Sequence, residues 1–238
     1  MRLRKYTCPP ELQSKYEEKI VADRSECLSI SVLSESQSDC FEWFEERAKR
    51  VTCSSKAHRI KTRRDAFESL ASQFKKNKFD GKMTEAMKYG LETESNARKS
   101  FEEQSGLKVT SVGLIINMTQ PFMATSPDGI ILSESSLLEI KCPFSCKNQQ
   151  IVNRDDKVSN VPYLKIDENN DIYLKKSDKY YTQIQVSMYI LNVNKCHFFV
   201  YSSRDNVELI VERDEHFLEE LIPKIEWFYF QHYLPLLF

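Results

Sequence analysis

Three side chains near the middle of the chain have the types and the spacing of a metal-dependent hydrolytic site. Asp128 lies in a Pro-Asp-Gly turn, and Glu139 and Lys141 follow in a short apolar stretch that ends at Pro143. Carboxylate oxygens suit Mg²⁺, which keeps positions open for water and phosphate. A bound metal lowers the pKa of its water, and a nearby lysine can orient that water or stabilise its hydroxide form. The set therefore predicts metal-assisted cleavage of a phosphate ester.

The three side chains converge only if a hairpin forms with the right register. Side chains alternate along a strand, so Glu139 and Lys141 share one face. With residues 133–136 as the loop, Asp128 lies opposite Lys141, and directly paired residues point to the same face. Any even loop length keeps this parity, whereas an odd one scatters the three unless a bulge intervenes. An ordinary turn followed by an exposed amphipathic strand fits the same residues, so both interpretations stay open here.

A further carboxylate interrupts an apolar face of a helix expected at 84–103. Side chains at three- and four-residue steps form a stripe that should face the core: Met83, Met87, Leu91, Glu94, Arg98 and Phe101. A bare carboxylate is costly to bury without a partner or a metal. Glu94 either joins the metal site or pairs with Arg98, since pairs four residues apart are frequent on helices.

A polar line also follows the helix expected at 178–192. Tyr180, Gln183 and Ser187 share one of its faces among apolar neighbours. The Gln183 amide could hydrogen-bond a water or a phosphate. It could equally be a boundary glutamine beside an aromatic core.

The net charge of −1 hides an asymmetry along the chain. The segment from Arg47 to Lys78 has 11 Lys and Arg against 2 Asp and Glu, a net of +9, which leaves −10 for the remainder. A basic block on an otherwise acidic chain suits contact with a phosphate backbone. A solvated helical face fits the block equally well.

The composition indicates a globular, intracellular protein. The 238 residues are 41% hydrophobic, which supports a sizeable core. No apolar run of 18 residues predicts a membrane span, and the N-terminus lacks the apolar region of a secretory signal. Seven scattered cysteines without a Cys-x-x-Cys pair favour reduced thiols over disulfides or zinc. We expect a nuclear location in a eukaryote and a cytoplasmic one otherwise.

The order of expected elements predicts an α/β (α+β) fold with a central mixed β-sheet flanked by helices. Residues 1–40 are assigned to an N-terminal extension, with a charged helix within 11–24 and a loop at 29–39, and residues 41–238 to the main domain. Other helices are expected at 41–50 and 214–230, and strands at 109–117, 122–125, 129–132, 137–142, 171–175, 196–202 and 207–212. Residues 143–170 are expected to be irregular. The aromatic tail from Trp227 to Phe238 fits core packing, with a partner surface as the alternative.

Five motifs follow one another in order through most of residues 43–190. They are Trp43-x-x-x-Arg47 leading into Val51-Thr52-Cys53-Ser54, Tyr89-Gly90-x-x-x-Glu94-x-x-Ala97-Arg98, Ala124-x-Ser126-Pro127-Asp128-Gly129, Glu139-Ile140-Lys141-Cys142-Pro143, and Tyr180-x-x-Gln183-x-Gln185. Together they resemble the phage lambda exonuclease / YqaJ-type viral recombinase family of PD-(D/E)xK nucleases. The resemblance implies a restriction-endonuclease-like core within residues 41–238.

The resemblance also implies roles at the metal. Asp128 and Glu139 would bind Mg²⁺, which Mn²⁺ could replace, with the Ile140 carbonyl as a further ligand. Glu94 would lie at the metal or directly behind its ligands. Lys141 would be the catalytic lysine, and Gln183 would assist at the reaction centre.

A second group implied by the resemblance would hold the 5′-phosphate end of DNA. Arg47 and Ser54 carry this role, with Thr52 and Tyr180 beside them. Family members typically digest one strand of linear duplex DNA from the 5′ end, in recombination or repair. The resemblance leaves open whether a single-strand annealing protein is a partner. It also leaves open whether the assembly is a trimer or a monomer. Lys49 or Arg50 and Cys53 stand where the family often has Gly and Ala, so end recognition is less fixed than the metal chemistry.

Two other functions compete with an end-dependent exonuclease. A structure-specific or internal endonuclease would use the same metal site but would cut closed circular DNA. A catalytically silent DNA-binding module would use the basic block alone, with salt-sensitive binding that chelation leaves unchanged. The clustered carboxylates disfavour the silent module, because they repel phosphate unless a cation lies between them.

Overall fold

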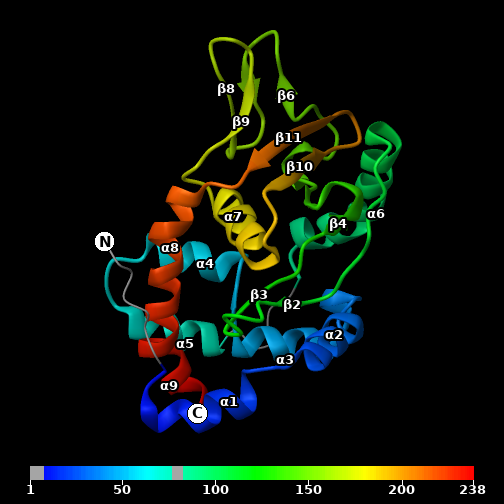
Figure 1. Cartoon of the computed structure of the whole chain (residues 1–238). Coiled ribbons are helices and arrows are strands. Elements are labelled where there is room, and N and C mark those ends of the chain that lie inside the picture. The colour runs from blue at the N-terminus through cyan, green and yellow to red at the C-terminus, as the bar shows by residue number, and fades with distance from the viewer. Residues whose placement is uncertain (1–7, 77–82) are drawn as a thin grey trace.

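The computed structural model describes residues 8–76 and 83–238 (Figure 1). Its α-helices are α1 (Gln13–Lys19), α2 (Arg24–Leu33), α3 (Phe41–Lys49), α4 (Ser55–Thr62), α5 (Phe67–Lys76), α6 (Glu85–Ser105), α7 (Lys179–Leu191), α8 (Glu215–Phe228) and α9 (Leu234–Leu237). Its strands are β1 (Val51–Thr52), β2 (Ile115–Ile116), β3 (Met123–Thr125), β4 (Gly129–Ile131), β5 (Ser136–Lys141), β6 (Val152–Asn153), β7 (Val158–Ser159), β8 (Leu164–Ile166), β9 (Ile172–Leu174), β10 (Lys195–Tyr201) and β11 (Asn206–Glu212).

The central sheet has four strands in the order β11-β10-β5-β4. Strand β5 runs parallel to β10 and antiparallel to β4, so the sheet is mixed. Leu138 and Ile140 of β5 pack with Phe101 of α6, while Leu137 packs with Ile184 of α7. Strand β5 is covered on both faces, and the predicted mixed sheet flanked by helices is confirmed.

A smaller sheet of three strands, β1-β3-β2, lies beside the first. The expected strand at 109–117 is wrong in extent, because only a Thr110 bridge to Ile130 and the two residues of β2 pair. Between them Gly113 lies against α2, where an added Cβ would come within 2.2 Å of the Ser31 carbonyl oxygen. This close approach to a helix takes the place of strand pairing.

Helix α2 takes the first part of the loop expected at 29–39, up to Leu33, and a turn followed by a 3-10 turn at Gln37–Asp39 forms the rest. Asp23 caps the first turn of α2, and the Glu26 side chain accepts from the Asp23 backbone N–H in return. Cys27 and Ile30 of the same helix pack on the cluster around Leu114. Capping and packing together outweigh the weak helix propensity of a serine-rich segment. The charged helix expected within 11–24 is present as α1, and the boundary at residue 40 stays a prediction.

The C-terminal aromatic residues form the largest core cluster. Phe228, Tyr229, Tyr233 and Leu234 are buried in it, and Tyr16 and Ile20 of the N-terminal segment belong to the same cluster. The core-packing interpretation of the tail is therefore confirmed. A π-helical turn at Tyr229–Tyr233 separates α8 from α9, where one helix to about residue 230 was expected.

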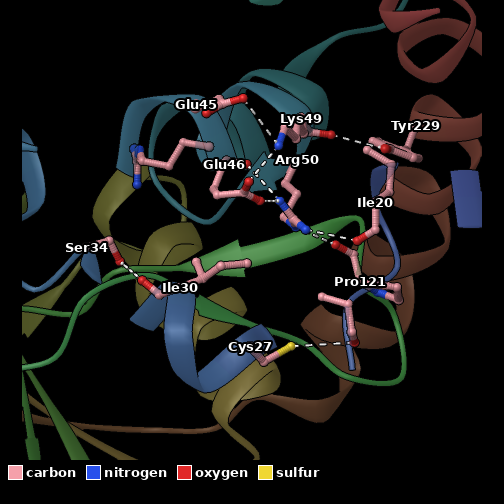
Figure 2. A network of polar contacts seen from close by, with 12 residues as sticks. Ile20, Cys27, Ile30, Ser34, Glu45, Glu46, Lys49, Arg50, Pro121 and Tyr229 are labelled. Carbon is pink, nitrogen blue, oxygen red and sulfur yellow. Dashed lines mark hydrogen bonds and ion pairs between the residues drawn. The ribbon is translucent and has the colours of Figure 1, made fainter. Parts of the chain in front are cut away.

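A buried arginine ties three separate segments together beneath this core (Figure 2). The Arg50 guanidinium donates to the carbonyls of Pro121 and Ile20, each at 2.9 Å, and to the Glu46 carbonyl at 3.1 Å. It also pairs with the Glu46 carboxylate, which binds Lys49 at 2.6 Å. Each guanidinium nitrogen thus has a partner within the chain.

Residues 143–170 are more ordered than expected. They contain β6, β7 and β8, which form two hairpins, β6–β7 and β8–β9, at the end of the molecule near β11 (Figure 1). Within residues 8–76 and 83–238, no helix has both the length and the apolar character that a bilayer crossing requires.

Candidate active site

The β4–β5 hairpin sets the geometry of the predicted metal site. Ile130 pairs with Leu137 and Gly129 with Leu138, so the register continues to place Asp128 opposite Glu139. The expected pairing of Asp128 with Lys141 is wrong by two residues, because a 3-10 turn at Leu132–Glu134 and a left-handed residue close the loop early. An even shift preserves the side-chain parity, and Asp128, Glu139 and Lys141 still share one face.

Three oxygen atoms converge on the Lys141 ammonium group. Lys141 Nζ pairs with Glu139 Oε1, donates to the Ile140 carbonyl at 2.9 Å and lies 3.9 Å from Asp128 Oδ2. The backbone N–H of Ile140 donates to the same Asp128 oxygen at 2.6 Å. One cation can therefore reach both carboxylates and the carbonyl at once.

Glu139 is almost completely buried and only half paired. The Gln183 amide donates to its Oε1 at 2.5 Å, whereas its Oε2 has no hydrogen-bond partner among the described residues. Burial raises the pKa of Glu139 to about 8, against the opposing charge of Lys141. Burial lowers the pKa of Lys141, but the charges of Glu139 and Asp128 outweigh it and hold that pKa above its usual value. An unpaired buried carboxylate oxygen is costly and suits a bound cation.

Glu94 pairs with Arg98 at 3.2 Å, which is the ion-pair alternative drawn from the helix pattern. It also lines one cleft with Asp128 and Lys141. Burial and the neighbouring charge of Asp128 raise its pKa. Glu94 thus lies beside the predicted metal site, and its part in metal binding stays a prediction.

The apolar stripe of α6 faces the core along only part of its length. Phe101 is buried under β5, as expected. Met83, Met87 and Leu91 are exposed, which contradicts the expected burial of the whole stripe. The reason is that this end of α6 borders a cleft of about 920 Å³ instead of the sheet.

Three of the four residues predicted to hold a 5′-phosphate lie together. Arg47 Nη2 donates to Ser54 Oγ at 3.3 Å, and that hydroxyl lies 3.3 Å from Thr52 Oγ1. The Arg47 guanidinium lies 3.9 Å from the centre of the Trp43 ring. Burial lowers the pKa of Arg47 to about 10, and no carboxylate of the described residues pairs with it.

Tyr180, the fourth, belongs to the Lys141 group. Its ring centre lies 5.1 Å from Lys141 Nζ. No hydrogen bond or ring contact joins it to Arg47, Thr52 or Ser54 within residues 8–76 and 83–238. The structure therefore divides the predicted end-binding set between two parts of the site.

The basic block is not one surface. Arg50 points inward and Lys49 pairs with Glu46, while Lys61 and Arg64 lie at the surface. Lys78 lies outside the described residues. The charge count alone could not separate these roles.

Two contacts near the site escaped the sequence patterns. The Gln37 amide donates to the Pro127 carbonyl, one residue before Asp128, at 3.3 Å. Tyr163 lines the cleft from within the segment expected to be irregular. The apolar run around Tyr163, in a segment rich in Asn, Asp and Lys, was a usable signal; the Gln37 contact, 90 residues apart in sequence, had none.

Comparison with known proteins identifies a family for this chain. The family model described as YqaJ-like viral recombinase domain matches residues 42–194. No curated protein sequence matches the chain significantly.

Three solved structures share the fold with this chain. The alkaline exonuclease LHK-Exo from Laribacter hongkongensis, in complex with dAMP, is 23% identical with a TM-score of 0.63, over 82% of this chain and 95% of that chain. A phage related exonuclease from Haemophilus somnus is 15% identical with a TM-score of 0.55, over 79% and 95%. The KSHV SOX protein in an RNA complex is 10% identical with a TM-score of 0.59, over 88% and 76%.

Proposed function

Because this chain belongs to the YqaJ-like viral recombinase domain family, we propose that it is a deoxyribonuclease that degrades linear double-stranded DNA from the 5′ end. The proposal includes dependence on Mg²⁺, with Mn²⁺ as a substitute. The observation that carries it is the convergence of Asp128, Glu139 and the Ile140 carbonyl on a single cation. The exonucleases among the structural neighbours support it.

The donor set fits a hard divalent cation. Two carboxylates and one carbonyl are oxygen ligands, and Glu139 Oε2 lacks a partner among the described residues. The set has two carboxylates, and within residues 8–76 and 83–238 no group of three or more His, Cys, Asp or Glu side chains is arranged to hold a metal. Water and substrate phosphate would complete the coordination, as is usual for Mg²⁺. When bound, the ion would neutralise charge on the phosphate and acidify a water.

The surrounding side chains would hold the reacting groups in position. Gln183 fixes Glu139 Oε1, and the Ile140 N–H fixes Asp128 Oδ2. The charges of Glu139 and Asp128 raise the pKa of Lys141 in the site without a metal. Its ammonium would stabilise negative charge that develops on the phosphate, where a fixed donor contributes most.

Arg47 would bind the terminal 5′-phosphate. Its guanidinium is held by Trp43 and Ser54 and lacks a carboxylate partner among the described residues. Guanidinium groups bind phosphate through paired, charge-assisted hydrogen bonds. Thr52 and Ser54 would add hydroxyl donors, and Tyr180 would contact the strand nearer to Lys141.

An internal endonuclease is the second candidate, since the same metal site would serve it. A neighbour of this fold, the KSHV SOX protein, forms a complex with RNA. The partly buried Arg47 favours the end-dependent exonuclease, because an internal cutter has no use for a terminal phosphate site. The proposal also includes a single-strand annealing protein as partner, and either a trimer or a monomer as the assembly.

The deciding experiment compares linear and closed circular duplex DNA. Purified protein with Mg²⁺ should shorten 5′-phosphorylated linear duplex and leave the closed circle intact. Lys141→Ala should digest neither, and Lys195→Ala, a lysine outside the cleft, should act as the wild type. Digestion of the circle would favour the endonuclease, and equal digestion by Lys141→Ala would refute the assigned site.

A further inference from the structure

Tyr163 lies in the wall of the catalytic cleft and belongs to none of the motifs. It follows β7 and directly precedes β8, and its side chain is 94% buried, with 6% exposed. Its ring centre lies 4.8 Å from that of Tyr180, at an interplanar angle of 89°, and 6.1 Å from that of Phe198. Lys175 donates its backbone N–H to the Tyr163 carbonyl at 3.0 Å. The ring is therefore held in one position.

The Tyr163 hydroxyl is buried and has no hydrogen-bond partner among the described residues. Other tyrosines of the core are paired: the Tyr181 hydroxyl donates to Asp214 at 2.7 Å, and the Tyr229 hydroxyl donates to the Lys49 carbonyl at 3.1 Å. Folded proteins keep few unpaired buried polar atoms, and those that persist often serve a ligand. Tyr163 itself lines the cleft that also contains Asp128 and Lys141.

The surroundings select the kind of ligand. Burial raises the pKa of Tyr163, so its hydroxyl stays protonated and acts as a donor. Tyr163 packs on Tyr180, and the Lys141 ammonium lies 5.1 Å from the centre of the Tyr180 ring. A neutral donor beside an ammonium group favours an anionic acceptor. Phosphate oxygens are the anionic acceptors of a DNA strand.

We propose that the Tyr163 hydroxyl donates a hydrogen bond to a phosphate oxygen of the DNA strand bound in the cleft, which makes Tyr163 a further catalytic residue. This inference rests on the proposed nuclease function. It assigns a substrate contact to the segment between β5 and α7, which the motifs leave without a role.

The test is Tyr163→Phe, which removes one oxygen atom and keeps the ring packing. We expect kcat/KM on linear duplex to fall about tenfold to a hundredfold, as for the loss of a hydrogen bond to a charged group. The melting temperature should stay the same or rise, because the substitution removes an unpaired buried hydroxyl. Tyr173→Phe, at an exposed position of β9, should change neither quantity, and Tyr181→Phe should lower the melting temperature alone.

A substrate scan identifies the contact. A methylphosphonate linkage removes the charge of one phosphate. Placed at the phosphate that Tyr163 contacts, it should lower the kcat/KM of the wild type. At that position the wild type and Tyr163→Phe should then have the same kcat/KM. Equal kcat/KM for the two proteins on unmodified DNA, or a difference that persists at every linkage, would overturn the proposal.

Failure of this proposal is distinguishable from failure of the nuclease assignment. If the wild type digests DNA and Lys141→Ala does not, the nuclease stands whatever Tyr163→Phe does. If the wild type proves inactive, DNA affinity measured in Ca²⁺ decides about Tyr163. An affinity about tenfold lower for Tyr163→Phe supports the contact, and equal affinity refutes it.

Discussion

Two regions of this molecule each contain a buried or partly buried arginine and a glutamate, and the two regions pair these side chains differently. Around Arg50, each guanidinium nitrogen bonds to the chain itself, and Glu46 is paired with Arg50 and Lys49 (Figure 2). In the candidate active site, Arg47 has no carboxylate partner among the described residues, and Glu139 keeps one unpaired oxygen. The first region pairs its buried charges within the chain, whereas the second leaves groups unpaired that suit the cation and the phosphate of our proposal.

The pKa values of Glu46 and Glu139 differ in the same way between the two regions. Burial raises the pKa of Glu46, but the charge of Arg50 and the hydrogen bonds from Lys49 outweigh it and hold the pKa below its usual value. Burial raises the pKa of Glu139 to about 8 despite Lys141. Strong burial without full pairing therefore marks the functional region, and strong burial with full pairing marks a structural one.

The largest effect is expected in the structural region. Arg50→Ala leaves one oxygen of the Glu46 carboxylate and several carbonyls without the arginine that they bind, while the other Glu46 oxygen keeps Lys49. Removing one partner of a buried pair costs about 3–5 kcal/mol. Urea unfolding should show this loss of stability, while the fraction that stays folded keeps its preference for 5′-phosphorylated ends. A loss no larger than that of an exposed substitution, about 0.5 kcal/mol, would remove the distinction between the two arginines.

Arg47→Ala should have the reverse profile. We expect the rate advantage of 5′-phosphate over 5′-hydroxyl duplex to fall about tenfold to a hundredfold, the effect of losing hydrogen bonds to a charged group. Its unfolding free energy should fall by less than that of Arg50→Ala, because the guanidinium makes one side-chain hydrogen bond and one contact with the Trp43 ring. Digestion of the two duplexes in parallel measures the ratio. An unchanged ratio would contradict the assignment of Arg47.

Metal binding should depend on pH through Glu139. Its raised pKa, about 8, means that below this pH the ion must displace a proton from the folded protein. The Mg²⁺ concentration for half-maximal activity should fall as pH rises towards 8, by up to about tenfold per unit, and then level. Glu46 shifts in the opposite direction, because its pKa is lower in the folded protein than in the unfolded chain. Its charge therefore stabilises the fold above the pKa of the unfolded chain, and this stabilisation is lost as pH falls through the lowered pKa. A flat metal requirement from pH 6 to 8 would contradict the Glu139 assignment.

The smallest effect is expected at the rim of the structural region. Lys49 is partly exposed, and exposed ion pairs contribute about 0–1 kcal/mol. Lys49→Ala should therefore shift the urea midpoint slightly and leave digestion unchanged. A loss comparable with that of Arg50→Ala would mean that the network depends on Lys49 as well.

The sequence predicted the convergence of three side chains better than it predicted the elements around them. Parity along a strand survives any even shift, so Asp128, Glu139 and Lys141 converge although the register was wrong by two residues. Local signals also sufficed for the long helices and for the mixed sheet. Capping and packing against Leu114 decided α2, which residue propensity alone does not predict.

The two arginines show where sequence reasoning stops. Arg47 lies in the last turn of α3 and Arg50 follows that helix as its C-cap, and their difference depends on partners that are distant in sequence. The Ile20 carbonyl is 30 residues away and the Pro121 carbonyl 71 residues away. Tyr163 is a similar case, because its lack of a partner is a property of the folded core.

The most direct test of the central claim is a calorimetric titration of Mn²⁺ at pH 8 into three proteins. The wild type should bind the ion, and Glu46→Gln should bind it equally well although it unfolds more easily. Glu139→Gln, which keeps the shape and removes the charge, should bind at least about tenfold more weakly. Equal Mn²⁺ affinity in Glu139→Gln and the wild type would contradict the metal site, and with it the proposed nuclease.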